Sequence, residues 1–291
     1  MDPSSIDEVS ALINDTWRAD GVRPLNDHLW LDLREGGRKG FAGVIVRDAD
    51  HDHIVGYCQI SRGNESWSLD LIVHPHHRYD SMEIAPDLIT AALDIVASEG
   101  GGHVHWWVFE PNEIHKTLAE SIGLNEGRTT LQMRVALPLR EVTDIVTTPF
   151  RSGVDDERWL AVNNAAFADH LEQGGWTQPT LDSRKQEPWF NPNGFLLLNE
   201  GDELAGFCWT KVHLDTSPVL GEIYVIAVHP RFSGKGLGRA LTIAGLTHLQ
   251  RAGISTGMLH VDADNERAVQ LYKSLGFTVT HQQRAFVGDV N

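Results

Sequence analysis

Cysteine is scarce in this 291-residue chain, which holds only Cys58 and Cys208. One pair of cysteines cannot build a disulfide framework or a cysteine-rich metal site. Residues 1–5 show neither a basic stretch nor an apolar run, so they do not resemble a secretion signal. No segment approaches the roughly 18 uninterrupted apolar residues of a membrane helix. We therefore expect a cytoplasmic protein that has no membrane partner.

Basic residues are also few, with 24 Lys and Arg against 40 Asp and Glu and a net charge of −16. A nucleic-acid backbone is excluded as the main partner, because phosphate binding needs a basic surface. An acidic protein suits a small substrate that carries an amine. The chain is long enough for two domains, and hydrophobic residues make up 41% of it. We expect the protein to be a monomer.

The chain repeats itself. Residues 53–59 (HIVGYCQ) resemble residues 203–209 (ELAGFCW), and residues 69–75 (LDLIVHP) resemble residues 223–230 (IYVIAVHP). Similar landmarks in the same order predict two copies of one domain. The alternative is a pair of unrelated domains with similar strands.

The pattern of apolar residues and turn residues predicts strands that alternate with helices, which is typical of the α/β class. In the second copy, strands are expected at 195–198, 204–212, 222–228 and 257–261, and helices at 236–251 and 265–275. In the first copy, strands are expected at 41–47, 53–61, 67–73, 103–109 and 130–137, and helices at 82–98 and 112–121. The two domains are predicted to span residues 1–141 and 147–291.

The strongest local signal is a glycine-rich turn between a strand and a helix, VIAVHPRFSGKGLGR at residues 225–239. Glycine allows close backbone approach, and free N–H groups at a helix start attract an anion. A diphosphate is the anion that best suits such a turn, and Lys235 and Arg239 could add positive charge. The spacing of Gly234, Gly236 and Gly238 fits neither a Walker loop nor a dinucleotide fingerprint. A tight structural connection is the alternative.

This turn, together with Asn265, Tyr272 and the Leu-Gly-Phe at 275–277, resembles the GNAT acetyltransferase superfamily. The resemblance implies two tandem GNAT domains, each a mixed, mostly antiparallel sheet flanked by helices. Gly236 and Gly238 match the diphosphate-binding pattern of that superfamily, whereas Ser233 stands where Gln or Arg is usual. It further implies acetyl-CoA as co-substrate, no metal, and cofactor contacts from Ile226, Ala227, Val228, Ser233, Gly234, Lys235, Gly236, Leu237, Gly238, Arg239, Asn265, Glu266, Arg267, Ala268, Val269 and Gln270.

The first copy lacks glycine in the corresponding turn, which reads HHRYDSME at residues 76–83. Side chains occupy the space that close approach needs, and Asp80 and Glu83 repel phosphate. We predict that this copy binds acetyl-CoA weakly or not at all and acts mainly as a scaffold. If it does bind, Leu71, Ile72 and Val73 would contact the pantetheine arm.

A narrower resemblance covers nearly the whole chain. The tandem organisation, HLEQGGWT at 170–177, GFCWTKVH at 206–213, EIYV at 222–225 and DADN at 262–265 are similar to the mycothiol synthase family. That family acetylates the cysteinyl amine of a cysteinyl-glucosaminyl-inositol. Two alternatives remain. The protein could acetylate another small-molecule or peptide α-amine, or it could be a non-catalytic acetyl-CoA sensor.

Single residues can be given expected roles in such a reaction. Glu222, at the start of the strand before the glycine turn, is the expected base, directly or through water, unless it faces solvent. Tyr272 is expected to protonate the leaving thiolate, unless it is only a core residue. The resemblance implies that Asp27, Glu172, Lys211, Glu222 and His260 bind the substrate.

Histidines cluster at 51–53 and at 74–77, in segments expected to be loops. Loop histidines without acids at ligand spacing are usually solvated, so no metal site is expected. The nine tryptophans are expected in the core and in pocket walls.

Overall fold

A computed structural model describes residues 3–21, 24–25, 27–34, 40–50, 52–63, 66–168 and 173–291. The chain forms two compact units, one from residues 1–129 with 282–291 and one from residues 130–281. These units differ from the segments 1–141 and 147–291, because strands β5 (Asn125–Ala136) and β11 (Thr278–Val290) each contribute to both units.

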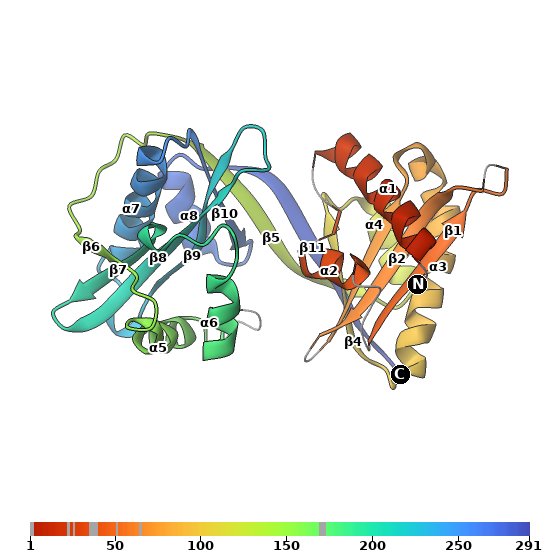
Figure 1. Ribbon diagram of the computed structural model, residues 1–291, viewed down its shortest axis with the longest axis horizontal. Coiled ribbons are helices and arrows are strands. Elements are labelled where there is room, and N and C mark those ends of the chain that lie inside the picture. The colour runs from red at the N-terminus through yellow and green to blue at the C-terminus, as the bar shows by residue number, and fades with distance from the viewer. Residues whose placement is uncertain are drawn as a thin grey trace. The chain divides into compact units, whose positions relative to one another are not determined.

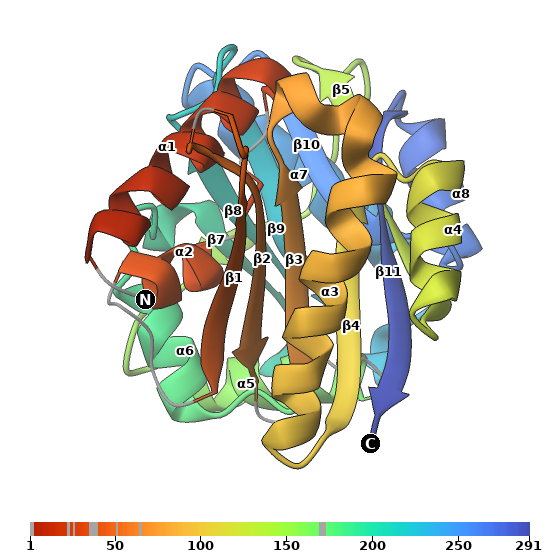
Figure 2. The same ribbon diagram turned by 90° about the vertical axis from the view of Figure 1, so that its right-hand side faces the viewer.

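The first unit is a sheet covered by helices on both faces (Figure 2). Its strands follow the order β1-β2-β3-β4-β11, antiparallel except for the parallel pair β3 and β4. Helices α3 and α4 cover one hydrophobic cluster, and α1 and α2 cover the other. The elements are α1 (Pro3–Asp20), α2 (Asp27–Arg34), β1 (Phe41–Arg47), β2 (Ile54–Arg62), β3 (Trp67–Val73), the 3-10 helix η1 (Pro75–Asp80), α3 (Ser81–Ser98), β4 (Gly102–Phe109) and α4 (Glu113–Ser121).

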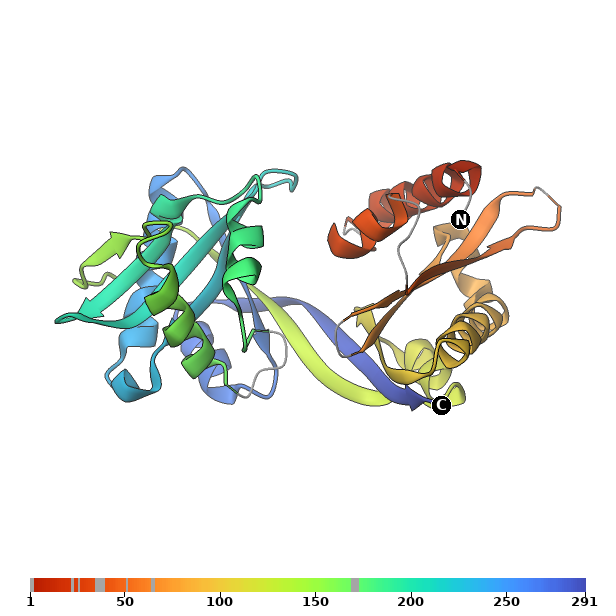
Figure 3. The same ribbon diagram turned by 60° about the horizontal axis from the view of Figure 1, so that its bottom comes forward.

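The second unit has the same layered arrangement, with strand order β5-β10-β9-β8-β7-β6 and one parallel pair, β9 and β10. Helices α7 and α8 pack on one face, and α5 and α6 on the other (Figures 1 and 3). The elements are β6 (Thr147–Pro149), α5 (Asp156–Ala166), α6 (Gln178–Lys185), η2 (Pro192–Gly194), β7 (Phe195–Glu200), β8 (Glu203–His213), β9 (Leu220–Val228), η3 (Pro230–Phe232), α7 (Leu237–Arg251), β10 (Thr256–Asp262) and α8 (Glu266–Ser274).

The apolar run in β7 shows why these sheets are covered twice. Leu196 and Leu198 pack in one hydrophobic cluster, while Phe195 and Leu197 pack in the cluster on the opposite face. Successive side chains of a strand point to opposite faces, so an uninterrupted apolar run is stable only between two helix layers. The expected mixed, mostly antiparallel sheets flanked by helices are confirmed.

The repeat is visible in the backbone. His74 and His229 each precede a 3-10 helix, with φ/ψ of −55°/134° and −55°/136°, and each imidazole accepts a hydrogen bond from the N–H two residues later. In both units, therefore, a strand is followed by a histidine cap, a proline and a helix.

The two copies diverge immediately after this shared turn. In the first unit, η1 runs through Asp80 directly into α3. In the second unit, η3 stops at Phe232, and Gly234 and Gly236 take left-handed φ values of 83° and 78° before α7 begins. The backbone bend before α7 thus has no counterpart in the first unit.

Among the described helices, none combines the length and apolar character that crossing a membrane requires.

Candidate active site

The glycine turn leaves the start of α7 open. Gly236 is the N-cap residue and has no side chain to cap the first turn of the helix, so backbone N–H groups are left without a side-chain acceptor. A Cβ built on Gly234, Gly236 or Gly238 would meet no atom within 4 Å. Donor groups, the positive end of a helix dipole and open space therefore coincide here. This combination fits a diphosphate.

The basic side chains near this turn are partly engaged. Arg239 donates to the Ser274 hydroxyl at 2.7 Å and lies 3.6 Å from Glu141. Arg231 donates to Glu203 at 3.2 Å, so it is held on the β8 side. The Lys235 ammonium lies 5.2 Å from the centre of the Phe232 ring. Direct phosphate contacts from Lys235 and Arg239 remain predictions.

Strands β9 and β10 separate beside the turn. Their parallel pairing runs from Gly221 with Gly257 to Ile223 with Leu259, although both strands continue beyond these residues. A bulge begins at the same place, because Val225 and Ile223 of β9 pair with successive residues of β8 and leave Tyr224 as the extra residue. The backbone of Ile226 to Val228 is therefore not paired to β10. Ile226, Ala227 and Val228 are among the residues expected to contact the cofactor.

Glu222 lies in the part of β9 that pairs in parallel with β10. The residue is buried, with 7% of its surface exposed. Each of its carboxylate oxygens accepts one hydrogen bond from an imidazole. His213 Nε2, at the end of β8, lies 2.7 Å from Oε2, and His260 Nδ1, in β10, lies 3.1 Å from Oε1. Both carboxylate oxygens are thus engaged, and the alternative of a solvent-facing Glu222 is excluded by its burial.

The charge state of Glu222 follows from these contacts. Burial on its own raises the pKa of the carboxyl, but the hydrogen bonds and the charges of His213 and His260 outweigh burial and lower the pKa to about 2. Glu222 is therefore ionised throughout the physiological range. A carboxylate with so low a pKa orients its partners well but accepts a proton poorly.

A hydrogen-bond chain defines the tautomer of His260. Arg134 donates to the Gln132 oxygen at 3.0 Å, so the Gln132 amide nitrogen, 3.3 Å from His260 Nε2, is the donor there. Because His260 donates from Nδ1 to Glu222, its Nε2 carries the lone pair. His260 has 38% of its side chain exposed. It presents an oriented imidazole at the surface of the site.

Tyr272 and Asn265 both have structural contacts on α8. Tyr272 is 7% exposed and packs against Phe277 at 5.7 Å between ring centres. Burial, with a smaller contribution from Cys208, raises the pKa of the phenol above its usual value, so it stays protonated. The Asn265 side-chain oxygen caps α8 by accepting the Ala268 N–H at 3.2 Å. Neither contact tests the cofactor roles expected for these residues.

Lys211 lies beside the carboxylate in an aromatic wall. It pairs in register with Glu222, and its ammonium lies 4.8 Å from the Trp189 ring centre and 5.7 Å from that of Tyr224. These rings also contact Trp209. Cation–π contacts of this kind hold a cationic side chain beside apolar surface.

Sequence reasoning missed His213, Trp189 and Tyr224. A signal for His213 was present, because Lys211 and His213 are two residues apart on β8 and hence share a face. Trp189 belongs to a segment that sequence patterns do not place in the site.

The remaining predicted residues are spread over the chain. Asp27 opens α2 in the first unit, and Glu172 lies outside the described residues. Beside Glu172, Gln173 is held by two hydrogen bonds with Asn163, at 2.9 and 3.1 Å. Ile72 is 2% exposed in the cluster under α1 and α2, whereas Leu71 packs on the opposite face.

In α8, Val269 is buried in the core, while most of the residues before and after it face solvent. The contacts expected from Glu266, Arg267 and Gln270 remain predictions.

Comparisons with known proteins agree with this geometry. Residues 159–277 match the family model described as Acetyltransferase (GNAT) family. Two solved structures share the fold over the whole chain: a GCN5-related N-acetyltransferase from Sphaerobacter thermophilus (TM-score 0.72, 22% identity, 94% of that chain) and a tandem GNAT protein from the clavulanic acid biosynthesis pathway (TM-score 0.70, 16% identity, 96% of that chain).

Curated relatives are more similar in sequence. The mycothiol acetyltransferase of Acidimicrobium ferrooxidans is 40% identical, covering 94% of this chain and 91% of that protein. The mycothiol acetyltransferase of Thermobispora bispora is 41% identical, covering 95% and 93%. At this identity and coverage, the chain belongs to the mycothiol acetyltransferase family, within the GNAT acetyltransferases.

Proposed function

We propose that the second unit transfers the acetyl group of acetyl-CoA to the cysteinyl amine of cysteinyl-glucosaminyl-inositol, giving mycothiol. The observation that carries this proposal is the pairing of an open glycine turn at the start of α7 with a buried Glu222 held between His213 and His260. The relatives are named mycothiol acetyltransferases, and the resemblance to that family implies the cysteinyl glycoside as the acceptor. The glycine turn binds the diphosphate of acetyl-CoA. His213, Glu222 and His260, called here the histidine–glutamate group, take the proton from the amine.

Acetyl-CoA supplies an activated acetyl thioester when it is bound. Backbone N–H groups of the turn from Ser233 to Arg239 hold its diphosphate, and the stretch of β9 from Ile226 to Val228, which pairs with β8 but not with β10, receives the thioester oxygen. Tyr272, whose raised pKa keeps it protonated, donates its proton to the leaving sulfur.

The amine nucleophile must lose a proton, since an α-amino group has an ordinary pKa of about 8. Glu222 was the expected base, but its low pKa favours a different division of roles. An imidazole of the pair His213 and His260 accepts the proton, and Glu222 fixes its tautomer and stabilises the charge that develops. The anionic Glu222 and the rings of Trp189 and Tyr224 beside Lys211 orient the substrate.

This division of roles predicts the pH dependence of kcat. A base must be unprotonated, so an imidazole base should make kcat fall on the acidic side of the profile, because imidazole is the side chain that changes charge between about pH 5 and 8. A carboxylate base with a pKa of about 2 would leave kcat flat down to acidic pH. Steady-state rates at saturating substrate between pH 5 and 9 distinguish the two. Comparing the pH profiles of kcat for His260→Gln and His213→Gln identifies which imidazole causes the fall at low pH.

The substrate is tested by CoA release with purified protein. The cysteinyl glycoside should be turned over, and a peptide with a free N-terminal cysteine should react much more slowly. Turnover of the peptide alone would favour the general α-amine acetyltransferase. Acetyl-CoA binding without turnover of either amine would favour a sensor.

One acetyl-CoA is expected per chain. The first unit lacks the left-handed bend, because η1 continues into α3 and Asp80 and Glu83 sit at that junction. Isothermal titration with acetyl-CoA should therefore give a stoichiometry near one. Two binding events per chain would contradict the scaffold role of the first unit.

A further inference from the structure

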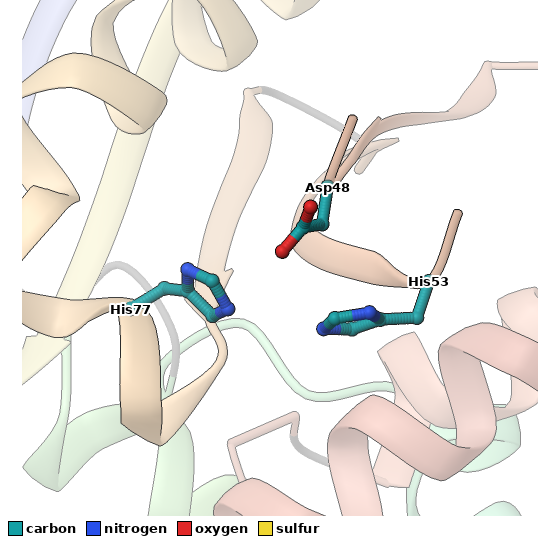
Figure 4. A group of neighbouring side chains, drawn as sticks. All are labelled: Asp48, His53 and His77. Carbon is teal, nitrogen blue, oxygen red and sulfur yellow. The ribbon is translucent and has the colours of Figure 1, made fainter. Parts of the chain in front are cut away.

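Three side chains of the first unit converge at the end of its sheet. Asp48 follows β1, His53 precedes β2, and His77 lies in η1, and one possible ligand atom from each lies within 4.8 Å of the others. Figure 4 shows the carboxylate and both imidazoles pointing into a common space. The three residues come from two separate segments, so the fold, not local spacing, brings them together.

The β1–β2 turn holds two of these groups in place. The Asp48 N–H donates to the His53 carbonyl at 2.9 Å, and the Asp52 N–H donates to the Asp48 carbonyl at 3.0 Å. The Asp50 N–H donates to Asp48 Oδ1 at 2.7 Å, which fixes the carboxylate. Asp52 takes a left-handed φ of 53°, as the tight turn requires. Preorganised ligands lose little conformational freedom on binding an ion.

Further imidazoles surround the three. The His74 ring centre lies 6.1 Å from that of His53 and 5.8 Å from that of His77, and His76 lies 5.2 Å from His74. Imidazole nitrogens are common ligands of transition-metal ions, so this grouping adds to the geometry of the three residues.

We propose that Asp48, His53 and His77 bind one divalent transition-metal ion, with zinc as the best match. Two or three imidazoles with a carboxylate are typical zinc ligands. In tetrahedral zinc sites, donor atoms at about 2.1 Å from the ion lie about 3.4 Å apart, so small side-chain rotations suffice. This proposal departs from the expectation that these histidines are solvated loop residues.

The ion would join the β1–β2 turn to η1, the 3-10 helix that corresponds to η3 in the second unit. Neither the acetyl-transfer chemistry nor the residues around Glu222 take part, so this inference stands independently of the proposed function.

Zinc titration of the full chain after chelator treatment tests the site. The unaltered protein should bind one equivalent, and Asp48→Asn and His77→Gln should each weaken binding by at least about tenfold, the low end of losses seen even for outer-shell changes. Asp48→Asn keeps an oxygen for the Asp50 N–H, so the turn should remain folded. Far-UV circular dichroism and thermal unfolding check this for each variant.

Two further variants serve as matched controls. His103→Gln removes an exposed histidine that faces Asp289 in the same unit. His213→Gln removes one of the two histidines that bind the Glu222 carboxylate. Both should bind zinc like the unaltered chain. Absence of binding at micromolar zinc, binding that Asp48→Asn and His77→Gln leave unchanged, or loss only in His213→Gln would overturn the proposal.

Discussion

Glu222→Gln should lower kcat by roughly 10²- to 10⁴-fold, the range typical for loss of a group in acid–base catalysis. The carboxylate accepts one N–H from His213 and one from His260, whereas an amide has only one accepting oxygen. One imidazole must then turn or change tautomer, and the charge that stabilises its protonated form is lost. Steady-state CoA release with the cysteinyl glycoside measures the effect.

The same variant should leave acetyl-CoA affinity nearly unchanged, because the glycine turn is formed by other residues. Glu200→Gln, at the exposed end of β7, is a suitable control and should retain full activity. If Glu222→Gln kept kcat within about threefold of the unaltered chain while remaining folded, the histidine–glutamate group would have no catalytic role.

Gly236→Val should reduce acetyl-CoA affinity by roughly 100-fold or more. The side chain enters the open space before α7 and disturbs a φ of 78°, so the N–H groups no longer converge on the diphosphate. Loss of two charge-assisted hydrogen bonds corresponds to about 3 kcal/mol or more, which is about this factor in affinity. Isothermal titration with acetyl-CoA reports it directly.

Backbone strain alone must be separated from loss of the site. Gly253 follows the other end of α7 with a φ of 87° and equally open surroundings, so Gly253→Val imposes a similar strain of about 1–2 kcal/mol without touching the turn. Gly238→Val tests the reverse case, since Gly238 has no left-handed φ but faces open space. Affinity should survive in Gly253→Val and fall in Gly238→Val; equal affinity in all three variants would make the turn merely structural.

Much of the fold follows from local sequence patterns. The strand predicted at 195–198 and the helix predicted at 236–251 lie within a residue or two of their predicted places. Each has a strong local cause: an apolar run or a helix start. The strand predicted at 130–137 instead begins at Asn125, because residues 125–129 belong to the first unit and residues 130–136 to the second. Pairing across the chain, not propensity, sets that length.

The site was only partly predictable. Glu222 and His260 could be named from the family resemblance, but the pairing of Glu222 with His213 depends on the register of β8 against β9. A single extra residue in β9 changes which side chains share a face, and no local pattern announces a bulge at Tyr224. The low pKa of Glu222 follows from that register, so sequence alone could not choose between a glutamate and an imidazole as base.

The histidines of the first unit show the same limit. Asp48 and His77 are far apart in the sequence, so ligand spacing could not connect them. Their meeting depends on η1 lying beside the β1–β2 turn.

A crystal structure of the chain with bound CoA tests the central claim most directly. The diphosphate should accept hydrogen bonds from backbone N–H groups between Ser233 and Arg239, with the sulfur near Tyr272 in the opening between β9 and β10. CoA bound only in the first unit, or bound in the second without contacting this turn, would contradict the account.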